Sequence, residues 1–183
     1  MTRFESCLCF VLNMEGGLSD DPSDRGGRTN LGITEGTLAR ARRDGLAHEG
    51  SVDSLTREVA RAIYEAYFWK PCRCGEMPAP IDLALFDAAV HMGTTTAARQ
   101  VQRALNLLGA EPPLAEDGIV GPRTLAAARG LPEKWRPRAA RVAIAVRSAA
   151  LLEIVTRSSS QRRFLAGWLN RLDRLMERGR REN

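Results

Sequence analysis

Residues 80–108 read PIDLALFDAAVHMGTTTAARQVQRALNLL, and this stretch indicates the fold class. Pro80 precedes the first half and Gly93 ends it, which is the usual placing of proline and glycine around a helix. Thr94–Thr96 can cap a second helix directly afterwards. Three apolar side chains of that second helix fall on one inward face: Val101, Leu105 and Leu108. The stretch predicts two consecutive amphipathic helices.

The same helical period runs through most of the remaining chain. Further helices are expected over residues 4–15, 34–43, 54–67, 122–129, 137–157 and 160–178. Turn-forming residues crowd into residues 18–33, and no segment sustains the alternation of apolar and polar residues that marks a strand. We therefore predict a mainly α fold, a helical bundle with at most a small β-hairpin in residues 18–33.

The composition is that of an ordinary globular protein with a basic surface. The chain has 183 residues, 44% of them apolar and 27% charged, and its net charge is +5. No apolar run approaches the length of a membrane span without a charge, so no stable membrane insertion is expected. The positive charge favours an anionic partner such as nucleic acid, a membrane surface or a cell-wall polymer, although a merely solvated surface would look the same.

Glu15 is the residue that points most directly to chemistry. It lies on the apolar face of the first predicted helix, at the end that precedes Gly16 and Gly17. Burial among apolar side chains and the negative end of the helix dipole both disfavour an ionised carboxylate. A carboxyl group that stays protonated near neutral pH is what a general acid requires. The alternative is a last helical turn in which Glu15 points into water.

Asp24 is the best candidate for a second carboxylate. It lies in a polar, glycine-rich loop, where a carboxylate is expected to stay ionised. Two carboxyl groups in unlike environments are typical of glycosidases. Asp20 and Asp21 are weaker candidates, and each of the three residues can instead shape the loop through an Asx turn.

Asp87 and His91 form a second polar group, four residues apart on one predicted helix. Asp87 can orient His91, or the two can be a buried polar pair without a role in binding. Trp69 and Trp168 can stack on sugar rings, although aromatic residues are only 5% of the chain and most are expected in the core.

Cofactor chemistry is not expected. The sequence holds no glycine-rich phosphate loop and no recognisable nucleophile triad. Its cysteines form two Cys-x-Cys pairs, Cys7/Cys9 and Cys72/Cys74, which is not the spacing of most zinc sites, so no metal is predicted. The N-terminus lacks the pattern of a secretory signal, and we therefore expect a protein that is cytoplasmic until another factor releases it.

The run EGGLSDDPSDRGGRTNLGIT at Glu15–Thr34 resembles the signature of glycoside hydrolase family 108, the bacterial and phage N-acetylmuramidases. The similarity continues in LFDAAVHMG at Leu85–Gly93. Three later runs resemble the peptidoglycan-binding half that usually follows the catalytic half: VQRALNLLG from Val101, EDGIVGPRTL from Glu116 and FLAGWLNRL from Phe164. The chain departs from the family pattern at Leu18, where tyrosine is usual, and at His91, where asparagine is usual.

The resemblance implies a lysozyme-like helical fold and assigns the general acid to Glu15. The spacing from Glu15 to Asp24 is similar to that in phage-type lysozymes, which implies that Asp24, with Thr29 nearby, positions the attacking water. Residues 1–93 would form a catalytic muramidase lobe, with residues 94–183 as a helical peptidoglycan-binding lobe packed on it in one globular unit. The residues expected to bind substrate are Asn30, Asp87, His91, Trp69 and Trp168.

The predicted function is that of a peptidoglycan hydrolase that cleaves the β-1,4 bond between N-acetylmuramic acid and N-acetylglucosamine, in phage-type cell lysis or in wall editing. Its partners would be peptidoglycan and a separate holin or secretion factor for export, with no nucleic acid. Two other classes stay open. One is a non-catalytic wall-binding module in which Glu15 is incidental, and the other is a nucleic-acid binder that uses the arginine-rich helices.

Overall fold

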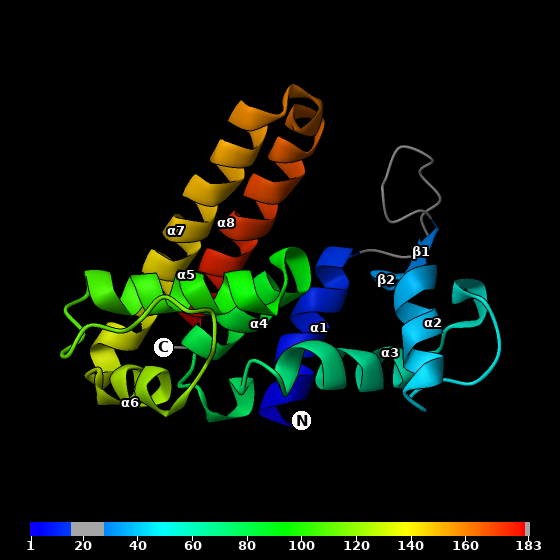
Figure 1. The fold of residues 1–183 in the computed structure, drawn as a ribbon, viewed down its shortest axis with the longest axis horizontal. Coiled ribbons are helices and arrows are strands. Elements are labelled where there is room, and N and C mark those ends of the chain that lie inside the picture. The colour runs from blue at the N-terminus through cyan, green and yellow to red at the C-terminus, as the bar shows by residue number, and fades with distance from the viewer. Residues whose placement is uncertain (16–27, 182–183) are drawn as a thin grey trace. The chain divides into compact units, whose positions relative to one another are not determined.

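The computed structural model describes residues 1–15 and 28–181, which are mainly α-helical with one small β-hairpin (Figure 1). This confirms the predicted fold class. The chain divides into two compact units, Met1–Trp69 and Lys70–Asn183, called here the N-terminal and C-terminal units. Within the described ranges, no helix combines the length and the apolar character needed to cross a bilayer.

The N-terminal unit consists of three α-helices and a hairpin in the part that the structure describes. Thr34 and Thr56 begin two of these helices as predicted, because their hydroxyls accept hydrogen bonds from the backbone N–H groups of Thr37 and Val59. The elements in chain order are α1 (Arg3–Glu15), β1 (Thr29–Asn30), β2 (Ile33–Thr34), α2 (Glu35–Arg43), the short η1 (Val52–Ser54), α3 (Arg57–Tyr64) and the π-helical turn η2 (Glu65–Trp69).

The C-terminal unit is built around one buried helix. Helix α4 (Ile81–Met92) buries every residue from Ile81 to Ala89, and helices α5 (Thr94–Leu107) and α7 (Arg136–Arg157) both pack on it. The last helix, α8 (Leu165–Arg181), lies alongside α7 as a helical hairpin (Figure 1). The remaining elements are η3 (Cys74–Glu76), α6 (Pro122–Gly130), η4 (Glu133–Trp135) and η5 (Ser159–Phe164).

The junction between α4 and α5 differs from the prediction in one detail. Pro80 and Gly93 flank α4 as expected, and Gly93 has a φ of 87° that stops the helix. Thr94–Thr96 do not cap α5, because α5 begins at Thr94 itself and Gly93 occupies the capping position. The predicted β element is the hairpin at Thr29–Thr34, and residues 18–27 of its expected range lie outside the described residues.

A buried glutamine of α5 organises the loop that joins α5 to α6. Gln102 is 2% exposed, and its Nε2 donates to Asp117 Oδ1 (2.7 Å), to the carbonyl of Ile119 (3.0 Å) and to Thr124 Oγ1 (3.3 Å). Its Oε1 accepts from the backbone N–H of Gly118 at 3.0 Å. The run EDGIVGPRTL therefore forms the end of the loop, residues 116–121, and the first turn of α6, and the Gln102 side chain holds polar groups of both from the inside.

One turn further along α5, Asn106 fastens the start of the same loop. Its side chain accepts from the N–H of Leu114 (2.8 Å) and donates to the carbonyl of Leu114 (3.0 Å). Gly118 lies so close to α5 that a Cβ atom there would be 2.5 Å from Thr95 Cγ2 and 2.9 Å from the Thr95 carbonyl oxygen. Loop and helix thus meet without room for a side chain.

We expect Gly118→Ala to lower the free energy of unfolding by about 3 kcal/mol, because the new methyl group meets the α5 backbone and the residue has a φ of +84°. Gly109→Ala is the matched control, since Gly109 has the same φ with nothing within 4 Å, and it should lose only about 1 kcal/mol. Urea unfolding of both variants measures the difference. Equal losses would show that the contact with Thr95 is not constraining.

Candidate active site

Glu15 is the last residue of α1, and its side chain is half-buried. Phe4, Leu8 and Val11 anchor the same helix in the core of the N-terminal unit. The turn of the hairpin lies directly against Glu15, since a Cβ atom on Gly32 would be 2.6 Å from Glu15 Cγ and 2.8 Å from Glu15 Cβ. Only a residue without a side chain fits between the hairpin and this carboxyl group.

The hairpin owes its shape to two residues with positive φ. Leu31 has a φ of 49° and Gly32 a φ of 72°, as in the two-residue type I′ turn that suits the twist of paired strands. Thr29 pairs with Thr34, and Asn30 with Ile33. The hydroxyl of Tyr64 on α3 donates to the carbonyl of Leu31 at 2.9 Å. Helix α3 thus holds the turn beside Glu15.

Two of the residues predicted for the site lie in this hairpin. Thr29 and Asn30 form β1, and both are half-buried. Asn30 Nδ2 donates to the carbonyl of Val52 at 2.8 Å, so its amide fastens the hairpin to η1. The roles of Thr29 in water placement and Asn30 in substrate binding stay predictions. Asp24 lies outside the described residues.

A surface groove of about 520 Å³ follows α1 between Glu5 and Asn13 and is also lined by Leu31 of the hairpin turn. Apolar side chains from α1 and the hairpin turn meet charged side chains of α3 in it, which is the mixture expected of a carbohydrate-binding surface. Its lining residues are Glu5, Leu8, Cys9, Leu12, Asn13, Leu31, Arg57, Glu58 and Arg61.

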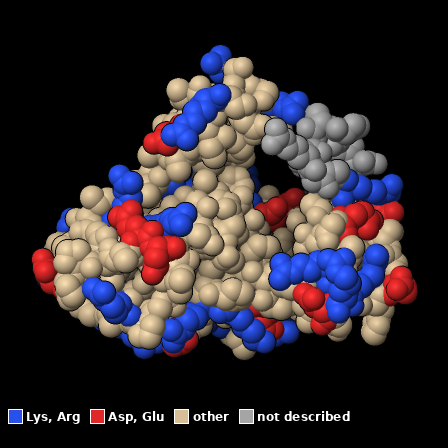
Figure 2. Space-filling model, in the orientation of Figure 1, with Lys and Arg blue, Asp and Glu red and all other residues tan. Residues whose placement is uncertain are grey.

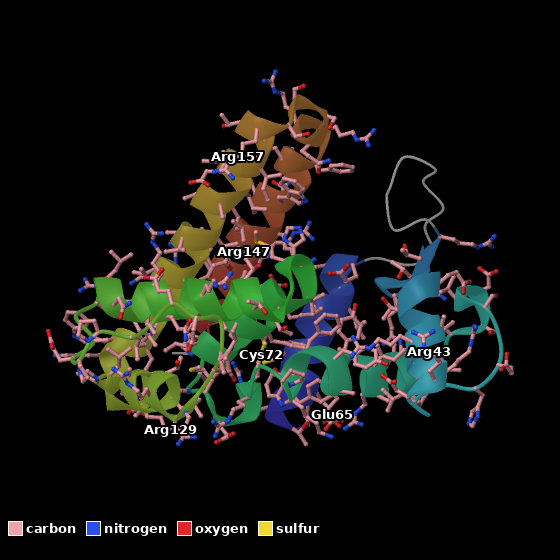
Figure 3. All side chains as sticks on the ribbon, viewed as in Figure 1. Arg43, Glu65, Cys72, Arg129, Arg147 and Arg157 are labelled. Atoms are coloured by element: carbon pink, nitrogen blue, oxygen red, sulfur yellow. The ribbon has the colours of Figure 1, made fainter. Side chains whose placement is uncertain are left out.

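Asp87 and His91 lie in the C-terminal unit, where the structure inserts an arginine between them. Asp87 is fully buried, and its carboxylate pairs with Arg147 of α7 at 2.6 Å and with Arg171 of α8 at 2.8 Å. Arg147, itself 1% exposed, also lies 2.7 Å from His91 Nδ1 through its other terminal nitrogen (Figure 3 labels Arg147). The cluster joins three helices through one fully buried carboxylate.

Charge and burial together fix the protonation of this cluster. Burial alone would raise the pKa of Asp87, but the guanidinium groups of Arg171 and Arg147 outweigh it and hold that pKa below its usual 3.8. Burial, reinforced by the same arginines, lowers the pKa of His91 from 6.5 to about 3. His91 is therefore neutral at pH 7, and its Nδ1 accepts the hydrogen bond from Arg147.

Sequence reasoning missed Arg147 and Arg171, although a signal for Arg147 exists. The inward face of α7 follows the helical period through positions 140, 143, 144, 147 and 151. All of these positions are apolar except 147, which is an arginine. A charged residue at an inward position needs a partner of opposite charge. That partner lies 60 residues away along the chain, which no local pattern reveals.

The two tryptophans have unlike surroundings. Trp69 is 8% exposed and packs on Phe4 with ring centroids 5.2 Å apart, which places it in the core of the N-terminal unit. Trp168 is half-buried in the C-terminal unit, stacked on Phe164 at 6.0 Å and edge-on to His91 at 5.8 Å. Substrate binding by the two tryptophans and by Asp87 and His91 stays a prediction. Within the described ranges, no cluster of His, Cys, Asp and Glu is arranged to hold a metal ion.

Comparisons with known proteins divide the chain into two consecutive parts. The family model described as Glycosyl hydrolase 108 matches residues 8–93, and the model described as Predicted Peptidoglycan domain matches residues 96–173. The solved structure of Brucella abortus SagA is similar over 96% of this chain and 92% of that chain, with 31% identity and a TM-score of 0.77. A search of curated proteins finds no significant match.

The boundary between the family models differs from the boundary between the compact units. The models meet between residues 93 and 96, whereas the units meet between Trp69 and Lys70. Helix α4, with Asp87 and His91, therefore belongs to the first model and to the C-terminal unit. The division into lobes of 1–93 and 94–183 stays a prediction.

We expect Gly32→Ala to reduce hydrolytic activity at least tenfold, because the added methyl group displaces Glu15 or Tyr64. Gly45→Ala is the matched control, since Gly45 has a nearly identical φ of +73° with nothing within 4 Å. Both variants should lose about 1 kcal/mol of stability or more from the backbone conformation. Activity that falls equally in the two variants would remove the contact with Glu15 as the cause.

We expect the buried His91 to make stability fall as the pH is lowered. Its folded pKa of about 3 lies below its ordinary value of 6.5, so between these values the unfolded chain binds the extra proton. The free energy of unfolding should then decrease by roughly 1.4 kcal/mol per pH unit below about pH 6. His91→Gln should abolish this slope and His48→Gln, at an exposed position, should keep it, as measured by urea unfolding at several pH values. An unchanged slope in His91→Gln would contradict the assignment.

Proposed function

We propose that this chain, which belongs to the glycosyl hydrolase 108 family, cleaves the β-1,4 bond between N-acetylmuramic acid and N-acetylglucosamine. The family and the peptidoglycan domain that follows it make the protein a glycosidase that acts on peptidoglycan. The muramidase bond is our choice among the glycosidic bonds of that polymer. That choice rests on the resemblance of the run Glu15–Thr34 to the N-acetylmuramidase signature.

The observation that carries the proposal is the close packing of the hairpin turn on the Glu15 side chain. Gly32 approaches its side chain closely, and Tyr64 fixes the turn that contains Gly32. A general acid must present its proton to the glycosidic oxygen in a fixed position, because proton transfer depends steeply on geometry. The groove along α1 includes Leu31, which precedes Gly32 in the turn against Glu15, and it offers the apolar and charged groups that a glycan with peptide branches would meet.

In the reaction that we propose, Glu15 donates its proton to the bridging oxygen and the leaving sugar departs from an oxocarbenium-like transition state. Water then attacks the anomeric carbon. We assign the placing of that water, and the uptake of the proton that it loses, to the Asp24 carboxylate, assisted by Thr29. A water between the two carboxyl groups corresponds to inversion at the anomeric carbon, whereas carboxyl groups only about 5 Å apart would favour retention.

For the cellular role, we propose phage-type lysis or wall editing, with a holin or a secretion factor releasing the enzyme from the cytoplasm to the wall. The net charge of +5 supports the part of this proposal that concerns the wall, because a basic protein concentrates at an anionic envelope. The cleavage chemistry does not depend on which of the two roles applies.

The variant Glu15→Gln tests the catalytic assignment. It should lower the rate of peptidoglycan hydrolysis by about 10²–10⁴-fold while binding to wall fragments is retained, because the amide keeps the shape but has no proton to transfer. Glu49→Gln, at an exposed position in the same unit, should hydrolyse at the parent rate. Mass spectrometry of the products should show new reducing N-acetylmuramic acid ends.

Two other outcomes would decide against the proposal. New N-acetylglucosamine ends would make the protein a glucosaminidase. Binding to walls without hydrolysis by the parent protein would make it a wall-binding module, the class that the peptidoglycan domain would support by itself.

A further inference from the structure

A second groove, of about 530 Å³, lies between α5 and α7 in the C-terminal unit. We name it the α5–α7 groove. Figure 2 shows charged side chains of both signs over this part of the molecule. The groove is lined by Thr96, Arg99, Gln100, Arg103 and Leu107 of α5, by Glu116, and by Val142, Ala145, Val146, Ala149, Ala150 and Glu153 of α7.

The α5 wall of the groove presents two arginines that form no close ion pair. Arg99 and Arg103 are exposed and lie one helical turn apart, and neither forms an ion pair within 4.0 Å or a side-chain hydrogen bond among the described residues. The nearby carboxylates make their contacts elsewhere: Glu153 pairs with Arg157 at 3.4 Å, Glu116 accepts from Asn106, and Asp117 accepts from Gln102, although the charge of Arg99 also helps to lower the pKa of Asp117. The groove thus offers a site for a carboxylate.

Gln100 supplies an independent sign of a missing ligand. It is 5% exposed, and its Nε2 donates to the sulfur of Met92 at 3.3 Å. Its Oε1 is buried and accepts no hydrogen bond from any described residue. A buried acceptor without a partner destabilises a protein by about 1–3 kcal/mol. A ligand with an N–H or O–H group would supply the missing donor.

The α7 wall fixes the size of what can enter. Apart from Glu153, the residues that it presents are alanines and valines at helical spacing. Small side chains leave shallow depressions that accept methyl groups and exclude larger ones. A ligand that suits the whole groove therefore carries carboxylates, amide N–H groups and methyl groups together.

We propose that the α5–α7 groove binds the peptide stem of peptidoglycan through its free carboxylates. A stem built of alanines and an acidic residue has all three features, with carboxylates for Arg99 and Arg103, an amide N–H for Gln100 and methyl groups for the α7 wall. This assignment rests on the proposed function, because it takes peptidoglycan as the substrate. In this assignment the C-terminal unit binds the peptide of peptidoglycan, and Glu15 of the N-terminal unit acts on the glycan.

The test measures binding of a fluorescently labelled, synthetic stem peptide in its free-acid form to the full chain by anisotropy. The double variant Arg99→Gln/Arg103→Gln should bind it at least tenfold more weakly than the parent. Arg162→Gln/Arg174→Gln removes the same charge from exposed positions of the same unit and should bind within twofold of the parent. Circular dichroism and thermal unfolding verify that both double variants are folded.

Two further arms separate this groove from general attraction to anions. A stem peptide with amidated carboxyl groups should bind the parent at least tenfold more weakly than the free acid. Ala149→Leu, which fills the α7 wall and keeps every charge, should also weaken binding of the free acid. Equal losses in the two arginine double variants, or no effect of amidation, would overturn the proposal.

Failure of this inference can be told apart from failure of the proposed function. If the parent hydrolyses glycan strands stripped of peptides but does not bind the stem peptide, the groove assignment is wrong and the glycosidase proposal stands. If the stem peptide binds in the way described but Glu15→Gln hydrolyses walls at the parent rate, the catalytic assignment is wrong and the groove assignment stands.

Discussion

The C-terminal unit depends on one buried carboxylate that two arginines share. Asp87 on α4 lies between Arg147 of α7 and Arg171 of α8, so a single negative charge ties the long helical hairpin to the central helix. Such a group is expensive to desolvate, and its attraction to two cations is what makes its burial possible. Removal of Asp87 would leave two neighbouring arginines without their shared counter-ion, so both arginine positions depend on this carboxylate. The neutral state of His91 follows from its burial, reinforced by the positive charges of the same two arginines.

The N-terminal unit holds a half-buried carboxyl group, that of Glu15, at the end of a helix. Helix α1 supplies Glu15, and the hairpin turn fixes it from the side. The turn itself is fixed from α3 by Tyr64. The Asn30 amide donates to the Val52 carbonyl, and the N–H of Val52 donates to the Glu35 carboxylate, so that η1 braces the far side of the hairpin. The position of Glu15 is thus set by elements that are distant in sequence.

Much of the fold follows from local signals in the sequence. Thr34, Thr56, Pro80 and Gly93 mark helix boundaries because each satisfies or removes specific backbone groups, and the structure places helices at these points. Contacts between distant helices could not be predicted from the sequence, because the helical period identifies an inward residue but not the residue that it contacts. Arg147 shows this limit, since its position was readable from α7 while its partner lies on α4.

The candidate site was also predictable only in part: the sequence located Glu15 but not the residues that pack against it. The end of α1 follows from its apolar stripe and Gly16, and this gives the location of Glu15. The close approach of Gly32 depends on the path of the hairpin, which no periodicity describes. Asp87 was expected to serve binding or to be a buried polar pair, and its contacts now give it a structural part in the second unit.

The loop held by Gln102 has a consequence for how such a domain diversifies. Along α5, the residues at 102 and 106 turn inward and are consumed in building the loop, whereas those at 99 and 103 turn outward into the groove. The residues that hold the loop and the residues that line the groove are therefore neighbours on adjoining parts of one helix surface. A descendant of this chain is free to exchange its outward residues, and with them its preference for one wall chemistry or another, while the frame beneath remains intact.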